Sequence, residues 1–432
     1  MKFASTRGQG EAVSLSRALR LGAAPDGGLF MPAQLPRVDW TALDPERPLA
    51  HFAAELLRPF FADDPLAASL DAICAATFSF PVPLVTPDGW QPRLQALELF
   101  HGPTGAFKDF GARFLLAAFD RLSGPEPLTV LAATSGDTGG AVGCAAEGRG
   151  SVRAIILSPR GRVSPFQLRQ LTCWGEPVTA LEVDGDFDAC QALAKAAFRD
   201  ERLSARHRLT SANSINLGRL LPQMAYSAHA AVRVAAETGS RPGFIVPTGN
   251  LGHGFAVLLA RALGAPIGPV ILATNANPTL AEWGASGQYS PRPALTTIAN
   301  AMDVGDPSNF ERLRSLGVQP DDVRVERVGD DAIRARIAAD YARAGYVWCP
   351  HSAIAAEAWW RLPKAEREER PWIAAATAHP AKFAEVVEPL IGRRVTLSEP
   401  LARIIDRPTA RRRIAPTLAA LADALAEQRV PA

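Results

Sequence analysis

The stretch His101-Gly-Pro-Thr-Gly-Ala-Phe-Lys-Asp-Phe-Gly111 carries the strongest chemical signal in the chain, and Lys108 lies at its centre. The apolar run 94–100 predicts a strand before it, and the pattern over 110–122 predicts a helix after it. Lys108 is therefore expected near a helix start, where the partial positive charge of the amides helps a neutral amine to form. A neutral amine suits a Schiff-base lysine. The alternative is an ordinary solvated surface lysine, since most lysines are exposed to solvent.

From about residue 93, short apolar runs alternate with helical patterns. Strands are expected at 128–133, 151–157, 177–183, 243–246, 269–274, 346–348 and 371–376. Helices are expected at 164–172, 186–200, 217–238, 255–263 and 353–362, and before this region at 14–21, 48–60 and 64–77. Such alternation is typical of a doubly wound parallel sheet, which binds its ligands at the carboxyl ends of strands.

Three polar loops follow expected strands and open expected helices. Thr134-Ser-Gly-Asp-Thr-Gly139 offers hydroxyls and amides to an anion, although these residue types also serve simply as helix caps. Asn213-Ser-Ile-Asn-Leu-Gly-Arg219 adds a guanidinium suited to phosphate, although a lone arginine is more often on the surface. Gly249-Asn-Leu-Gly-His-Gly254 converges amides and a helix dipole on one point, as phosphate cradles do. A structural tight turn is an equal alternative for this last loop.

Other classes of site are disfavoured. The 249–254 loop is neither a GxGxxG fingerprint nor a P-loop, which argues against a dinucleotide or ATP. The net charge is +2, with 46 basic and 44 acidic residues, so nucleic-acid and membrane partners are not expected. The five cysteines are odd in number and lack metal-ligand spacing, so neither a disulfide framework nor a metal site is expected. The polar N-terminus predicts a cytoplasmic protein.

The two ends of the chain carry no obvious catalytic cluster. Residues 1–92 mix short helices with Pro and Gly breaks and are interpreted as an N-terminal packing and lid-like domain. Residues 391–432 are interpreted as a C-terminal helical extension, in which 411–413 begin a solvated helix. Between them, 93–390 is expected to form the catalytic core.

With these motifs in view, the chain resembles the threonine synthase family, in the branch with the enterobacterial and fungal enzymes. The resemblance spans nearly the whole chain and is carried by 5–8, 26–29, 101–109, 134–139, 213–216 and 377–383. It implies the tryptophan synthase β-like α/β fold (fold type II) of pyridoxal 5'-phosphate enzymes. Such a fold has doubly wound open sheets, here a core of two α/β subdomains, and an additional N-terminal domain.

The resemblance also implies roles for particular residues. Lys108 resembles the catalytic lysine that binds the cofactor covalently. The residues that match cofactor-binding positions are Asp137 near the phenolic oxygen, Thr377 near the pyridine nitrogen, and Gly249, Asn250, Leu251, Gly252 and His253 around the phosphate. Those that match the substrate-phosphate pocket are Ser135, Thr138, Asn213, Ser214 and Arg219. The chain departs from the family pattern at Leu251 and His253, where Phe and Asp are more usual.

The implied reaction converts O-phospho-L-homoserine and water to L-threonine and phosphate, by γ-elimination and β-addition of water. The freed Lys108 amine would take the α-proton, while Arg219, hydroxyls and helix-start amides would stabilise the departing phosphate. A neutral Thr377 hydroxyl would leave the ring nitrogen unprotonated more readily than a carboxylate would. The expected protein is a monomer with a small-molecule substrate.

Two alternatives stay open. One is another lyase of the same fold, either a phospholyase acting on a different amino-alkyl phosphate or a serine/threonine dehydratase. The phosphate pocket at 213–219 argues against a dehydratase. The other is a catalytically silent, ligand-binding relative, which an intact Lys108 and two anion cradles disfavour.

Overall fold

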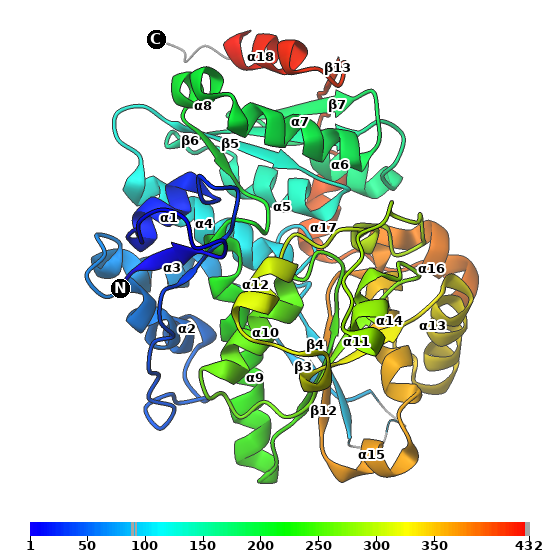
Figure 1. Cartoon of the computed structure of the whole chain (residues 1–432). Coiled ribbons are helices and arrows are strands. Elements are labelled where there is room, and N and C mark those ends of the chain that lie inside the picture. Colours follow the sequence, from blue (N-terminus) through cyan, green and yellow to red (C-terminus); the bar gives the residue numbers. More distant parts are fainter. Residues whose placement is uncertain (88–89, 91–92, 428–432) are drawn as a thin grey trace.

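Two mainly parallel sheets organise the chain, as the computed structural model in Figure 1 shows. The structure describes residues 1–87, 90 and 93–427. The larger sheet has six strands in the order β11-β10-β9-β12-β4-β3, and the smaller has five in the order β13-β7-β6-β5-β8. All pairs of neighbours are parallel except β3 with β4. The predicted α/β fold with two open sheets is confirmed.

The strands of the larger sheet are β3 (Leu84–Val85), β4 (Leu94–Glu98), β9 (Gly243–Pro247), β10 (Val270–Thr274), β11 (Arg324–Arg327) and β12 (Trp372–Ala376). Those of the smaller sheet are β5 (Leu128–Ala133), β6 (Val152–Pro159), β7 (Val178–Val183), β8 (Leu209–Ser211) and β13 (Arg412–Ile414). A separate antiparallel pair, β1 (Phe3–Ser5) and β2 (Phe30–Pro32), lies near the N-terminus.

The helices that precede strand β9 in the chain are α1 (Leu15–Leu21), α2 (Leu49–Leu57), α3 (Leu70–Thr77), α4 (Lys108–Leu122), α5 (Asp137–Ala146), α6 (Pro165–Thr172), α7 (Phe187–Arg199), α8 (Glu201–His207) and α9 (Leu221–Thr238). Those after it are α10 (Gly252–Ala262), α11 (Thr279–Ser286), α12 (Phe310–Ser315), α13 (Asp330–Ala344), α14 (Pro350–Trp360), α15 (Lys364–Glu369), α16 (Ala384–Ile391), α17 (Glu399–Ile405) and α18 (Leu418–Glu427). Short 3-10 turns include η3 (Leu217–Arg219) and η6 (Pro380–Phe383).

Strand β12 shows why the larger sheet needs helices on both faces. Successive side chains of a strand point to opposite faces. Ile373 and Ala375 accordingly join the core that packs under α4, α9 and α10, whereas Trp372, Ala374 and Ala376 join the core under α13, α14 and α16. A continuous apolar run is what a strand buried on both faces requires.

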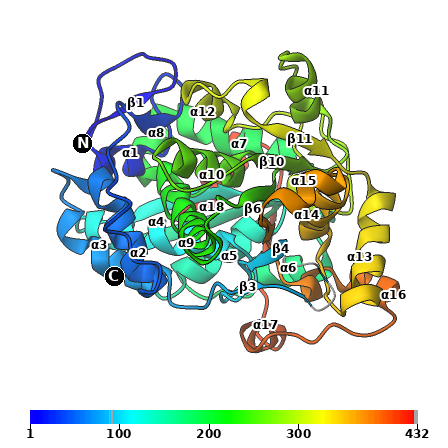
Figure 2. The same ribbon diagram turned by 90° about the horizontal axis from the view of Figure 1, so that it is seen from below.

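The N-terminal helices complete the first of these cores. Apolar side chains of α1, α2 and α3 belong to the same buried cluster as those of α4 and α9. Figures 1 and 2 both show α2 and α3 on one side of α9, with α13 and α14 on the other. The predicted domain division at residue 92 stays a prediction, and that residue lies outside the described ones.

Two local predictions are wrong, and a third is wrong at one end of its helix. Residues 346–348 form no strand, because Tyr346 and Trp348 pack their rings against Trp90 at 5.6 and 5.4 Å between ring centroids. The arginines at 411–413 do not begin a helix: 412–414 form β13, which pairs with β7 and buries Ile414. Charged side chains at the exposed positions suit such an edge strand. The predicted helix at 64–77 starts later, at Leu70.

Candidate active site

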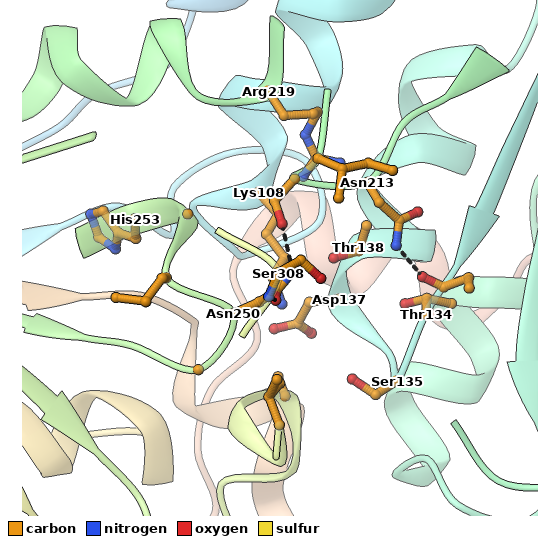
Figure 3. Close-up of a pocket in the computed structure, with 18 of the residues that line it drawn as sticks. Lys108, Thr134, Ser135, Asp137, Thr138, Asn213, Arg219, Asn250, His253 and Ser308 are labelled. Atoms are coloured by element: carbon orange, nitrogen blue, oxygen red, sulfur yellow. Dashed lines mark hydrogen bonds between the residues drawn. The ribbon is translucent and has the colours of Figure 1, made fainter. Parts of the chain in front are cut away.

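One cavity lies where the carboxyl ends of β4, β9 and β12 face those of β5 and β8. The predicted site residues that line it are Lys108, Ser135, Asp137, Thr138, Asn213, Ser214, Arg219, Gly249, Asn250, Leu251, Gly252, His253 and Thr377. Figure 3 shows Lys108, Asp137, Thr138 and Ser308 around this space, with His253 to one side. The structure thus brings every predicted site residue to one place, and the role of each remains a proposal.

Lys108 is the first residue of α4, two residues earlier than the predicted helix. Its side chain is half-buried because the amine faces a cavity that itself lies deep between the sheets. Burial lowers the pKa of the Lys108 amine to about 8; Asp137 opposes this shift, and Lys382 and Arg219 add to it. A neutral amine is therefore accessible just above neutral pH, and its main cause is burial, whereas the sequence argument relied on the helix-start amides.

The 134–139 loop is fixed by the hydroxyl of Thr134. Thr134 Oγ1 accepts hydrogen bonds from the backbone N–H groups of Gly136 and Gly139, at 2.9 and 3.0 Å. Gly136 has φ +146°, and a Cβ there would lie only 2.5 Å from the Gln167 amide, so the turn requires glycine. The half-buried side chains of Ser135 and Thr138 are left at the cavity wall.

Asp137 opens α5 and holds a buried charge at the cavity. Its Oδ1 accepts from Lys382 Nζ at 2.8 Å and from Gln167 Nε2 at 3.1 Å. Burial alone would raise the pKa of the Asp137 carboxyl, but Lys382 and Lys108 together hold it well below its usual range. Asp137 is therefore an anion at any pH at which the protein works.

The 213–219 loop reaches both sheets. Asn213 Nδ2 donates to the carbonyl of Ala133 at 2.7 Å, at the end of β5. Ser214 Oγ accepts from Asn250 Nδ2 at 2.8 Å, which ties this loop to the 249–254 loop. Arg219 is 3% exposed and donates to the carbonyl of Ala212, while burial lowers the pKa of its guanidinium to about 10. Arg219 is thus a fixed, buried cation rather than a mobile surface arginine.

The 249–254 loop turns sharply into α10. Leu251 adopts a left-handed conformation (φ +64°) and Gly252 begins the helix. A Cβ on Gly249 would lie 2.7 Å from the backbone Cα of Met302, so the loop needs a glycine to fit against that segment. Asn250 Oδ1 accepts from the backbone N–H of Ser308 at 2.6 Å. The first amides of a helix have no partner within it, and this helix start lines the cavity, which suits a phosphate cradle.

His253 stacks on Phe107, the residue before Lys108. The two ring centroids are 4.7 Å apart at an interplanar angle of 20°, and the Tyr226 ring meets His253 edge-on at 5.6 Å. Burial lowers the pKa of His253 to about 3, so the ring is neutral. A neutral ring at this position supports the floor of the cavity without adding charge to the cradle.

Thr377 follows β12 and is almost fully buried. Its backbone N–H donates to Ser352 Oγ at 2.8 Å, its carbonyl accepts from Phe107 N–H at 2.9 Å, and its Oγ1 lies 3.4 Å from Ser352 Oγ. Thr377 therefore lines the cavity next to the segment that leads into the Lys108 helix, as expected from the end of a strand.

Sequence analysis missed several neighbours of these residues. Lys382 lay inside the 377–383 motif but received no role; its only local signal is a lysine between Ala381 and Phe383 in an apolar turn. His351 also lines the cavity, and its Nε2 accepts from the backbone N–H of Ala301 at 3.1 Å. Burial lowers the pKa of His351 to about 4. Contacts of this kind join distant segments and leave no local pattern.

The residues fit pyridoxal phosphate. The Lys108 amine is available for an aldehyde, and the 249–254 loop supplies amides for a phosphate within the same cavity. The hydroxyl of Thr377 and the carboxylate of Asp137 can meet the polar atoms of a ring placed between them. In the part of the chain that the structure describes, no cluster of His, Cys, Asp and Glu could hold a metal ion, and no helix could cross a membrane.

Comparisons with known proteins agree with this geometry. The model of pyridoxal-phosphate-dependent enzymes matches residues 80–376, the model of the threonine synthase N terminus matches 2–78, and that of the threonine synthase C-terminal region matches 352–425. The threonine synthase of Serratia marcescens is 38% identical over 416 residues, which cover 94% of this chain and 95% of that protein.

Solved structures are similar over the whole length. The Escherichia coli threonine synthase structure has a TM-score of 0.92 at 36% identity and covers 99% of this chain and 100% of its own. The pyridoxal-phosphate-bound threonine synthase of Brucella melitensis has a TM-score of 0.90 at 33% identity and covers 99% of both chains. The expected family, fold and cofactor are confirmed. This chain belongs to the threonine synthase family of pyridoxal-phosphate-dependent enzymes.

Proposed function

We propose that this chain converts O-phospho-L-homoserine and water to L-threonine and phosphate, with pyridoxal phosphate bound covalently to Lys108. One observation carries the proposal: a lysine whose amine is readily neutral shares one cavity with two separate helix-start loops, 134–139 and 249–254. A phosphorylated cofactor and a phosphorylated substrate need two anion sites at once. A dehydratase needs only the one for its cofactor.

The 249–254 loop is assigned to the cofactor phosphate. Gly249, Asn250, Leu251, Gly252 and His253 form it, and the donors are backbone amides, so the unusual Leu251 and His253 do not remove them. Asp137 is assigned to the phenolic oxygen and Thr377 to the pyridine nitrogen. When bound, the cofactor supplies a ring that takes up the electrons released when carbon–hydrogen bonds break.

Lys108 is assigned the proton transfers. With a pKa of about 8, its amine has an appreciable neutral fraction near pH 7 and can accept the substrate's α-proton at Nζ. The protonated amine that results lies near the Asp137 carboxylate, which favours the positive charge. The same Nζ can then return a proton, so the residue ends the cycle in its starting state.

The 134–139 and 213–219 loops are assigned to the substrate phosphate. Hydroxyls of Ser135, Thr138 and Ser214, the amide of Asn213 and the Arg219 guanidinium line that side of the cavity. Arg219 is buried and held by a backbone carbonyl, so its charge needs no reorganisation when phosphate leaves. These groups favour expulsion of phosphate from the γ-carbon, after which water adds at the β-carbon.

We also propose a monomer working in the cytoplasm. The exposed large apolar side chains in the described part are Leu35, Leu295 and Ile405, which are scattered rather than gathered into a docking patch. The cysteines at 74, 144, 173, 190 and 349 are all free, which suits a reducing compartment. The division into 1–92, 93–390 and 391–432 is kept as part of this proposal.

The test is a product assay on the purified protein loaded with pyridoxal phosphate. Adding O-phospho-L-homoserine should release phosphate and L-threonine in a 1:1 ratio, and a Lys108→Ala variant should release neither. A visible cofactor band without phosphate release would point to a lyase with another substrate. Formation of a 2-oxo acid from L-serine or L-threonine as the main activity would point to a dehydratase. No band after cofactor addition would leave only the silent, ligand-binding alternative.

A further inference from the structure

Asp137 lies between two lysines but pairs with only one of them. Lys382 Nζ is 2.8 Å from Asp137 Oδ1, and in the described part of the chain it is Lys382 and not Lys108 that makes an ion pair with this carboxylate. Lys108 is still close enough for Asp137 to raise the pKa of its amine. The Asp137 carboxylate therefore interacts with two lysines, but it makes its ion pair with Lys382.

The surroundings of Lys382 explain why Asp137 pairs with it. Its side chain is 0% exposed, and Nζ makes a second hydrogen bond to the carbonyl of Thr104 at 2.8 Å. A short 3-10 turn, η6, holds its backbone between buried neighbours Ala381 and Phe383. Separating a buried ammonium from such partners is costly, because it leaves buried charged and polar groups unpaired, so the contact with Asp137 is a fixed part of the fold.

We propose that Lys382 is a positioning residue: as the ion-pair partner of Asp137, it keeps that carboxylate from pairing with Lys108 and so leaves the Lys108 amine easier to deprotonate and free for the cofactor. The inference rests on the proposed function, because it explains how one site holds an anionic Asp137 and a readily deprotonated lysine together. Without Lys382, the buried Asp137 would take its counter-charge from Lys108, the other lysine whose charge acts on it.

The other charged groups around these residues do not substitute for Lys382. Arg219 disfavours a charged Lys108, but its guanidinium donates to the carbonyl of Ala212. Among the described residues it makes no ion pair with Asp137. His351 is neutral because burial lowers its pKa to about 4. Asp109, which follows Lys108, bonds through its carboxylate to the Thr104 hydroxyl and N–H. These contacts leave Lys382 as the cation that neutralises Asp137.

The experiment measures how fast the full-length, cofactor-free protein forms its Schiff base with added pyridoxal phosphate between pH 6 and pH 10. The visible band gives the rate, and borohydride trapping with peptide mass spectrometry confirms the lysine that reacts. The rate should rise with pH through a midpoint near 8, because only the neutral amine attacks. Titrations of the cofactor itself are common to all variants and cancel in their comparison.

A charge series then isolates Lys382. Lys382→Met should raise the midpoint by about one to two pH units and slow loading at pH 7 at least about tenfold, because Asp137 now favours a charged Lys108. Asp137→Asn should move the midpoint in the opposite direction. The double variant K382M/D137N should return it to within about half a unit of the parent chain. Every variant lacking Lys382 also lacks the bond to Thr104, so a loss of packing alone cannot produce this pattern.

Two results would overturn the inference: an unchanged midpoint in Lys382→Met, or a double variant that shifts as far as Lys382→Met does. If Lys382→Met does not fold, as judged by its thermal unfolding, Asp137→Asn alone decides, since an unchanged or raised midpoint contradicts the proposal. No substrate enters this experiment. A chain that shows the predicted midpoints but releases no threonine would refute the proposed function and leave the role of Lys382 standing.

Discussion

The 134–139 loop and the 249–254 loop are built alike but hold opposite kinds of chemistry. Each follows a parallel strand, β5 or β9, and each opens a helix, α5 or α10. The first brings the carboxylate of Asp137 to the cavity, and a buried lysine, Lys382, neutralises it. The second presents backbone amides and the neutral side chains of Asn250, Leu251 and His253.

The two loops are also fixed in different ways. Thr134 holds the first from inside, through two hydrogen bonds to its own amides. The second is held from outside: Asn250 bonds to Ser214 and to Ser308, which belong to other segments. One strand-loop-helix geometry therefore serves in the first loop to place a carboxylate beside the hydroxyls assigned to the substrate phosphate, and in the second to hold an anion passively, through neutral groups alone. Substitutions in each loop should therefore have different effects on turnover and on cofactor affinity.

The largest effect is expected at the charged loop. Asp137→Asn should lower kcat for phosphate release about 100- to 1,000-fold, since it removes a preorganised charge at the reacting centre. Cofactor affinity should fall less than about tenfold, because the phosphate cradle is untouched. Steady-state kinetics and fluorescence titration of the cofactor measure the two quantities, with exposed Asp188→Asn as the control. Equal losses in affinity and kcat would remove the proposed distinction.

The passive loop should show the reverse. In Gly249→Ala the new methyl group would lie 2.7 Å from the Cα of Met302, so the backbone must shift and the cradle deform. Cofactor affinity should fall about tenfold or more, while kcat at saturating cofactor stays within about threefold of the parent value. Gly124→Ala, which meets nothing within 4 Å, is the matched control. A collapse of kcat with intact affinity would assign this loop a chemical role.

The internal support of the charged loop should appear as stability. Thr134→Val leaves the N–H groups of Gly136 and Gly139 without their acceptor, so the free energy of unfolding should fall by about 1–3 kcal/mol. Urea denaturation measures this, and Thr41→Val, whose hydroxyl bonds to exposed Asp39, should change it by less than about 0.5 kcal/mol. Similar values for both variants would mean that Thr134 does not fix the loop.

The smallest effect is expected at the outer edge of the passive loop. Arg7 pairs with Glu311 at 2.5 Å near the segment that carries Ser308, but both side chains are well exposed. Arg7→Ala should destabilise the protein by less than about 1 kcal/mol, and added salt should shrink the difference. Thermal unfolding at two ionic strengths checks this. A larger, salt-independent loss would show that this contact helps to hold the second loop.

The sequence predicted those features whose cause is local. Strand β5 and the start of α4 near Lys108 follow from apolar patterning and from helix-start signals. Ligands of parallel sheets bind at strand ends, and the thirteen predicted site residues indeed line one cavity at the ends of the strands. The loop pattern alone indicated that 249–254 could hold a phosphate, whereas the individual roles of 135, 137, 138, 213, 214, 219, 249–253 and 377 came from family resemblance.

What the sequence could not predict depends on distant contacts. Lys382 and Asp137 are far apart in the sequence, and nothing local in either segment signals that they make an ion pair. The aromatic run at 346–348 resembles a strand, yet its rings pack on Trp90 instead of pairing. Residues 412–414 become a strand only because β7 offers an open edge. In each case tertiary packing decided the outcome.

The most direct test is to reduce the cofactor-loaded protein with borohydride and locate the label by peptide mass spectrometry. Two lysines interact with the same carboxylate: Lys382 makes the ion pair with Asp137, and we assign the reactive amine to Lys108. A pyridoxyl group on Lys108, with Lys382 unlabelled, is the predicted result. A label on Lys382, or no label in a protein that still releases threonine, would contradict it.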